Sequence, residues 1–149
     1  MNRTRFPAGT EILVSFILLV FVGAGCDRTK IALPDGTRIR PEVARTPDKL
    51  AQGLSGREDI GDGMLFCFTE EKIQAFWMLD MYVPIDMVWL KDGVVVGVSE
   101  RVPIREFNDW SRRWSPEPVD AVLELASGDA LKHKIITDSI VSDINKACK

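Results

Sequence analysis

G-M-L-F-C-F-T-E-E-K-I-Q-A-F-W-M-L-D-M-Y-V-P-I-D-M-V-W-L, residues 63–90, is the stretch of sequence that decides the fold. It holds four of the chain's five methionines and two of its four tryptophans, so any core must pass through it. Apolar residues occupy both alternating sets of positions from 64 to 68, which gives a strand with two apolar faces. Such a strand is expected in the interior of a sheet rather than at its edge.

Two more strands are expected in the same stretch, at 75–81 and 85–90, because both segments are apolar and rich in aromatic side chains. Pro84 separates them, since proline has no N–H to give to a continuous ladder. K-D-G at 91–93 predicts a tight hairpin turn into a further strand at 94–99.

The chain before this stretch predicts a hairpin and a short helix. P-D-G at 34–36 is a turn sequence, and it joins expected strands at 30–33 and 37–43. A helix of about two turns is expected at 46–54, because Thr46 can cap it, Pro47 suits its first position and Gly53 ends it.

After residue 101, a long loop is expected at 102–118, which contains three prolines. A strand at 119–126, one helical turn at 129–134 and closing strands at 135–136 and 139–144 follow. Many short strands with one or two short helices predict a mainly β chain. Its expected fold is a compact jelly-roll-like sandwich or flattened barrel.

The N-terminus has the layout of a secretory signal. Arg3 and Arg5 precede an apolar run at 12–22, and the small residues at 23–25 lead to Cys26. The run is too short to cross a bilayer as a helix, which takes roughly 20 residues. We therefore expect a signal peptide at 1–25, a lipidated Cys26 with a short tether at 26–30, and a single β domain at 31–149.

A cysteine directly after V-G-A-G resembles the signal of bacterial lipoproteins, in which that cysteine receives a lipid. A lipid on Cys26 would anchor the protein to the membrane rather than thread it through. The expected location is the bacterial cell envelope, on the side that faces the periplasm. A plain signal peptide with an incidental cysteine, or an uncleaved anchor, is the alternative.

Composition excludes several classes of function. The net charge of −3 argues against a nucleic-acid partner, because such proteins carry a basic face for phosphates. With one histidine and no two cysteines close together in sequence, the chain has no metal-site motif, and no phosphate loop or cofactor motif occurs.

Cys67 and Cys148 can form a disulfide in an oxidising envelope. Equally, Cys67 can be a small core residue and Cys148 a free thiol.

Four motifs carry a family resemblance: G-L-S-G-R at 53–57, G-M-L-F-C-F at 63–68, the run from F-W-M-L-D at 76 to 90, and V-L-E-L-A-S-G at 122–128. They resemble the domain-of-unknown-function family 192, also known as uncharacterised protein family 0127. The resemblance covers roughly residues 39–144. It implies a compact, mostly β domain of jelly-roll type, frequently exported, with no established activity.

One departure from the family lies beside Trp77. The family usually reads W-M-K-N where this chain has Trp77-Met78-Leu79-Asp80, so a positive charge is lost. A ligand that touches Leu79 and Asp80 would therefore differ from that of other members.

Arg57, Asp86 and Glu124 stand out because they are polar residues inside otherwise apolar or glycine-rich motifs. A carboxylate buried among aliphatic residues needs a cationic partner, and Arg57 can hold one through two hydrogen bonds. The three residues are expected to form either a structural clamp or the polar floor of a ligand cleft. Asp80 and Asp86 suit a glycosidase pair only if the chain folds sharply at Pro84, since six residues of straight strand span about 20 Å.

The tryptophans divide into two groups. Trp77 and Trp89 lie in apolar strands and are expected in the core, although Trp77 is also a candidate for ligand contact. Trp110 and Trp114 lie in the long loop and are expected at the surface.

The function expected from these features is binding of an envelope protein, glycan or peptide. The alternatives are an envelope enzyme that uses Asp86 or Glu124 as acid or base with Arg57, and a purely structural lipoprotein. The candidate ligand-binding residues are Arg57, Trp77, Asp80, Asp86, Trp110, Trp114 and Glu124.

Overall fold

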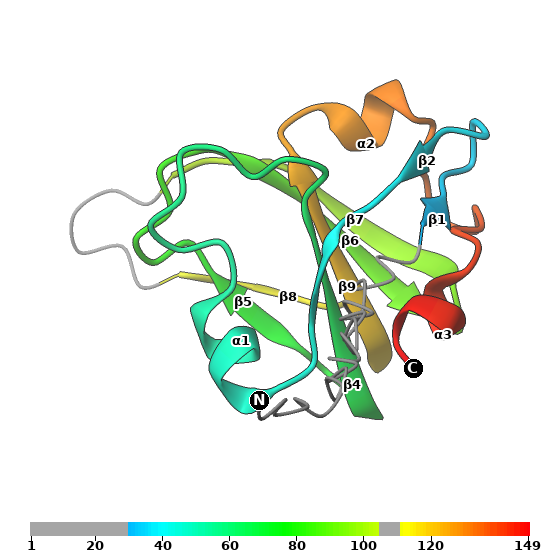
Figure 1. Ribbon diagram of the computed structural model, residues 1–149, viewed down its shortest axis with the longest axis horizontal. Coiled ribbons are helices and arrows are strands. Elements are labelled where there is room, and N and C mark those ends of the chain that lie inside the picture. The colour runs from blue at the N-terminus through cyan, green and yellow to red at the C-terminus, as the bar shows by residue number, and fades with distance from the viewer. Residues whose placement is uncertain (1–29, 105–110) are drawn as a thin grey trace, which may run out of the picture.

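The computed structural model describes residues 30–104 and 111–149 (Figure 1). The expected signal peptide, Cys26 and Trp110 lie outside these residues. The main sheet is built from β3 (Glu42–Ala44), β4 (Met64–Lys72), β6 (Ile85–Lys91), β7 (Val94–Val102) and β9 (Val119–Ala126). Its strand order is β3-β4-β9-β6-β7, with β3 parallel to β4 and all other pairs antiparallel.

Two small sheets and three short helices complete the described fold. β1 (Ile31–Ala32) pairs with β2 (Arg38–Ile39), and β5 (Ala75–Trp77) pairs with β8 (Arg112–Trp114). The helices are α1 (Pro47–Gln52), α2 (Asp129–Lys132) and α3 (Ile144–Ala147). None of the helices in the described part of the chain has the length and apolar character needed to cross a membrane.

Both faces of the main sheet are covered, which gives the compact, sandwich-like architecture expected from the sequence. Helix α1 and the β5–β8 ribbon cover one face, and the β1–β2 hairpin, α2 and α3 cover the other (Figure 1). Each face has its own apolar cluster, the first around Phe66 and Trp89 and the second around Leu65 and Leu123. The sheet stays open, with β3 and β7 at its edges, and the described residues form three short helices where one or two were expected.

Local signals placed several elements correctly. The Thr46 hydroxyl accepts a hydrogen bond from the Lys49 N–H at the start of α1, and Gly53 follows the last helical residue. Strand β4 is interior, between β3 and β9, as its two apolar faces predict. The expected hairpins β1–β2 and β6–β7 are also present.

Three expectations about local structure are wrong. The strand expected at 75–81 ends at Trp77, because the chain turns there and Asp80 takes a positive φ of 53°. The loop expected at 102–118 contains β8, whose partner β5 lies far away in sequence. Residues 135–136 form no strand, and the strand expected at 139–144 is reduced to isolated bridges at Ile140 and Ser142, since Asp138 and Asp143 also have positive φ.

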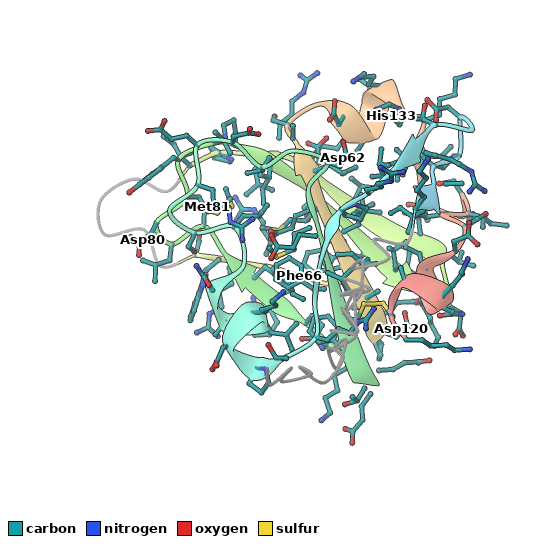
Figure 2. All side chains as sticks on the ribbon, in the orientation of Figure 1. Asp62, Phe66, Asp80, Met81, Asp120 and His133 are labelled. Carbon is teal, nitrogen blue, oxygen red and sulfur yellow. A yellow bond between two sulfur atoms is a disulfide. The ribbon has the colours of Figure 1, made fainter. Side chains whose placement is uncertain are left out.

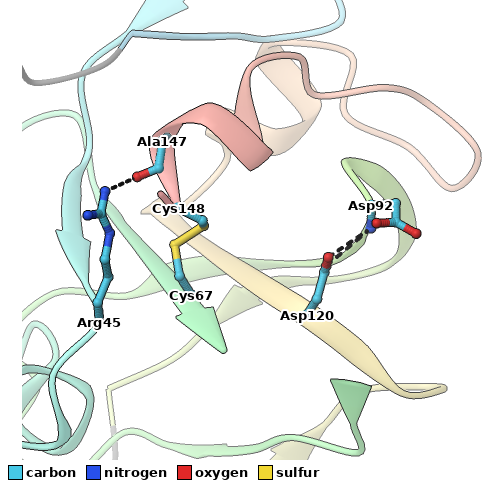
Figure 3. The surroundings of a disulfide bond; sticks show 6 residues. All are labelled: Arg45, Cys67, Asp92, Asp120, Ala147 and Cys148. Carbon is cyan, nitrogen blue, oxygen red and sulfur yellow. Dashed lines mark hydrogen bonds between the residues drawn. A yellow bond between two sulfur atoms is a disulfide. The ribbon is translucent and has the colours of Figure 1, made fainter. Parts of the chain in front are cut away.

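Cys67 and Cys148 form a disulfide, which decides between the two readings of these cysteines (Figure 3). The bond ties β4 to the residue that follows α3, across a sequence separation of 81. The Arg45 guanidinium donates a hydrogen bond to the Ala147 carbonyl beside it. The C-terminal end of the chain is thereby fastened to the middle of the sheet.

Candidate functional site

A pocket of about 170 Å³ lies on the α1 side of the main sheet. Its floor is formed by Phe66 and Phe68 of β4 and by Glu124 of β9. Helix α1 and the loop after it form one wall, and β5 forms the other. Figure 2 shows Phe66 among the side chains between α1 and the sheet.

The α1 wall is held in place by the turn that ends the helix. Gly53 has a positive φ of 52°, and a Cβ at this position would lie 3.2 Å from the Phe66 ring. The Ser55 hydroxyl donates a hydrogen bond of 2.9 Å to the Leu79 carbonyl, and the Gly56 N–H donates one of 2.8 Å to the Asp80 carbonyl. These contacts join the loop after α1 to the segment that follows β5.

The β5 wall is held by β8 and by a reciprocal pair of hydrogen bonds. The Gln74 N–H donates to the Ser115 hydroxyl, the Ser115 N–H donates to the Gln74 carbonyl, and both distances are 2.9 Å. Phe76 then meets Phe66 edge-on at 4.9 Å between ring centroids, and Trp89 at 5.7 Å. The aromatic walls are therefore packed against one another and preformed.

Glu124 is the one charged residue among the described residues that line the pocket. It lies on β9 between Met64 of β4 and Met87 of β6, and it is only 4% exposed. No hydrogen-bond or ionic partner for its carboxyl is found among residues 30–104 and 111–149. Within those residues no fully enclosed polar side-chain atom lacks a partner, so the carboxyl oxygens must open onto the pocket.

Burial raises the pKa of Glu124 from 4.5 to about 8, because the charged form loses its hydration. The carboxyl is therefore mostly protonated at neutral pH, and it offers one O–H donor to the pocket. Gly63 lies directly behind it: this glycine has a φ of +84°, and a Cβ there would come within 2.0 Å of the Glu124 carbonyl oxygen. Only glycine allows the two backbones to approach this closely.

Asp86 has a different role from Glu124. It is fully buried and accepts hydrogen bonds from the backbone N–H groups of Arg101 at 2.7 Å, Gly128 at 2.9 Å and Ala130 at 2.9 Å. The first of these contacts fixes an irregularity in the β6–β7 pairing, and the other two fix the start of α2. Asp86 therefore has a structural role: it holds β7 and the start of α2 to β6, on the α2 side of the sheet.

The expected clamp between Arg57 and these carboxylates is wrong. The Arg57 guanidinium pairs instead with Glu42 at the edge of the sheet, at 2.7 Å. The physical reason is strand register: Glu124 faces the α1 side, whereas Asp86 contacts α2 on the opposite side. The constellation of three polar residues is therefore not assembled.

One of the three described tryptophans does not lie where the sequence predicts. Trp77, expected in the core, lines the pocket but is 47% exposed, so it stands at the mouth with the Arg112 guanidinium 5.1 Å from its ring centroid. Trp89 is buried and Trp114 is 58% exposed, both as expected. Asp80 is exposed in the loop after β5 and contributes its backbone carbonyl rather than its carboxylate.

The sequence profile of DUF192, described as "Uncharacterized ACR", matches residues 30–142. The chain belongs to this family. Two solved structures are similar to it. One is a protein of unknown function from Novosphingobium aromaticivorans, with 28% identity over 76% of this chain and 81% of that one, and a TM-score of 0.67. The other, described as a putative transcription regulator from Sinorhizobium meliloti, has 29% identity over 76% and 89%, and a TM-score of 0.65. No curated protein matches the chain.

The pocket of this DUF192 domain uses residues that sequence reasoning assigned only to the core. Phe66 and Phe68 alternate on the same face of β4, and Phe76 faces them from β5. The sequence shows that Phe66 and Phe68 share a face of one strand. It does not show that Phe76, from another sheet, packs against them. Across the described residues, no group of three or more His, Cys, Asp or Glu side chains is arranged to hold a metal ion.

Chemically, the site combines apolar and aromatic surface with one carboxyl that has no partner among the described residues. Small-molecule sites commonly have this composition, in which apolar walls provide contact area and few polar groups fix orientation. The arrangement suits recognition of a small group that brings its own hydrogen-bonding or charged partner for Glu124.

Proposed function

We propose that this DUF192 domain is an exported, lipid-anchored binding module of the bacterial cell envelope. Its pocket receives a small group of an envelope ligand, which is a protein, a peptide or a glycan. The observation that carries the proposal is the preformed aromatic pocket with Glu124 open to it. Its volume of about 170 Å³ resembles that of a cavity of roughly 150 Å³ that accepts a benzene ring.

A purely structural role accounts less well for Glu124. A core position that served stability alone would favour an apolar residue, because a buried carboxyl without a partner lowers stability. Asp86 shows what a structural carboxylate looks like in this fold, since three backbone N–H groups satisfy it. Glu124 lacks such partners in the described chain and faces open volume instead.

The envelope location is supported by the signal-like N-terminus and by the disulfide. Disulfides persist in oxidising compartments such as the periplasm and are rare in the reducing cytosol. The description of the Sinorhizobium protein as a transcription regulator is not extended to this chain, whose net charge of −3 gives no surplus of positive charge for phosphates.

An enzyme remains the second candidate, because a buried carboxyl with a raised pKa suits a general acid or base. Arg57, the partner expected for such an enzyme, pairs with Glu42, and Asp86, the other expected acid or base, is held by backbone N–H groups. Among the described residues that line the pocket, no other carries a titratable carboxyl, imidazole, amine or thiol. Binding therefore accounts for the site better than catalysis, because it does not need a second titratable group beside Glu124.

The binding proposal is tested by blocking the pocket. Ala51 is exposed on α1 and lines the pocket, whereas Asp48 is exposed on the same helix and does not. Benzyl alcohol is expected to raise the melting temperature of the native protein and of Asp48→Trp, but not that of Ala51→Trp. Equal shifts in the two variants, or no shift in any of the three proteins, would reject the pocket as a binding site.

The anchor is tested separately. Cells that express the native chain should incorporate a clickable fatty-acid analogue into it, and Cys26→Ser should abolish the label. Labelling that persists in Cys26→Ser would reject lipid attachment at this residue.

A further inference from the structure

The pocket contains a buried carboxyl whose missing partner indicates the chemistry of the ligand. Glu124 is 4% exposed, and its β-sheet neighbours on either side are Met64 and Met87. A buried carboxylate is strongly stabilised by an opposite charge at contact distance, because the local dielectric constant is low. No described residue supplies that charge, and a cationic group bound in the pocket would supply it.

The pocket walls favour a cation over an anion. Phe66 and Phe68 of the floor and Phe76 of the β5 wall line the pocket together with Glu124, and aromatic rings attract positive charge to their faces. An anion would find no cationic side chain among the lining residues and would be repelled by an ionised Glu124. A neutral ligand with one carbonyl could accept the O–H of the protonated carboxyl, but it would leave the second oxygen unused.

The size of the pocket limits the cation. A cavity of about 170 Å³ admits a group close in size to benzene, which has room for an ammonium on a stem of about four carbons. A planar guanidinium on its stem is bulkier and has five donors to satisfy, whereas the pocket offers one carboxyl.

We infer that the pocket is a receptor for a primary ammonium group on a short apolar stem, with Glu124 as its counter-ion. The inference rests on the proposed binding function and names the ligand class for the same site. A lysine side chain and a free alkylamine share this chemistry.

The other charged residues of the described chain are not among those that line the pocket. Met64 of β4 and Met87 of β6 are the strand neighbours of Glu124, and Phe66, Phe76 and Leu50 line the pocket from β4, β5 and α1; none of these side chains titrates. Arg112 of β8 contacts Trp77 at the mouth and is exposed to solvent. Its charge weakens the attraction for an amine but is screened by salt.

Binding of n-butylamine and of butanamide, its neutral counterpart, is measured by calorimetry between pH 6 and pH 9. Because the amine needs ionised Glu124, its Kd should fall about tenfold for each pH unit up to the pKa of about 8 and then level off. The amine itself stays charged, since alkylammonium groups titrate near pH 10. Butanamide should bind more weakly at pH 9 and show no such rise in affinity.

The variants separate the charge from the shape of the site. Glu124→Gln should weaken butylamine at least tenfold at pH 9 and change butanamide less than twofold. Arg112→Ala removes the like charge at the mouth and should tighten butylamine two- to threefold at low salt. Butylamine that binds Glu124→Gln as tightly as the native protein would overturn the inference.

The source of the ammonium is distinguished with lysine blocked at both backbone ends. Tighter binding of blocked lysine than of butylamine, lost on Nε-acetylation, points to a polypeptide lysine, and the reverse order points to a free amine. If butanamide binds and neither amine does, the ligand class is wrong while the pocket proposal stands. If neither amine nor butanamide binds the native protein, and benzyl alcohol does not raise its melting temperature, both proposals fall.

Discussion

Replacing Glu124 with Gln should make the protein more stable above pH 5, by an amount that grows with pH. Glutamine keeps the shape of the side chain and stays neutral, so the variant isolates the effect of ionising a carboxyl that is only 4% exposed. Burial raises the pKa of this carboxyl from 4.5 in the unfolded chain to about 8 in the folded protein.

The sign follows from proton binding. Between pH 4.5 and about 8 the folded state holds a proton on Glu124 that the unfolded state has released, so the free energy of unfolding falls as pH rises. Each pKa unit corresponds to about 1.4 kcal/mol. The native protein should therefore lose about 3 kcal/mol by pH 7 and about 5 kcal/mol by pH 9, relative to pH 4, while Glu124→Gln escapes this loss.

The assay is urea unfolding of the native and Glu124→Gln proteins at pH 4.5, 7 and 9, under identical salt. The difference in the free energy of unfolding between the two proteins is the quantity of interest, because other titrating groups contribute equally to both. The reasoning is refuted if this difference stays constant across the pH range. A constant difference would mean that Glu124 is solvated or paired in the folded protein.

Three further predictions concern residues that stabilise the fold around the pocket. Asp86→Ala should lower the free energy of unfolding by about 3 kcal/mol or more, because three backbone N–H groups, at least partly buried, lose their carboxyl acceptor; a loss below 1 kcal/mol in urea unfolding would contradict this role. Replacing Cys67 and Cys148 together with Ser should cost about 2–4 kcal/mol, and a reductant should reproduce that loss in the native protein but not in the double variant. Gly63→Ala should lower stability by about 2 kcal/mol or more in thermal melts, because its Cβ would overlap the Glu124 carbonyl; an unchanged melting temperature would show that the backbones can separate.

The sequence predicts those helix ends, turns and strands that depend on residues close together in the chain. Thr46, Pro47 and Gly53 bound α1 because capping depends on residues within one turn. The K-D-G turn likewise determines the β6–β7 hairpin from adjacent residues. The apolar residues on both faces of β4 determine that this strand lies in the interior of the sheet. The family resemblance was also contained in short contiguous motifs, and the match over residues 30–142 confirms it.

Tertiary structure decided which carboxylate belongs to a site. Asp86 and Glu124 look alike in sequence, since aliphatic residues flank both. Strand register turns Asp86 toward three backbone N–H groups on the α2 side and Glu124 toward open volume on the α1 side. A shift of one residue exchanges the two faces of a strand, so only the pairing of β9 with β4 and β6 could settle this difference.

The walls of the pocket depended on contacts between distant segments in the same way. Strand β5 gains its partner β8 from beyond residue 110, and Cys67 gains Cys148 from the end of the chain. Composition showed that these residues were suited to strands and to a disulfide. Which partner each one met was set by the packing of the whole chain, because contacts between segments far apart in sequence leave no local pattern to read.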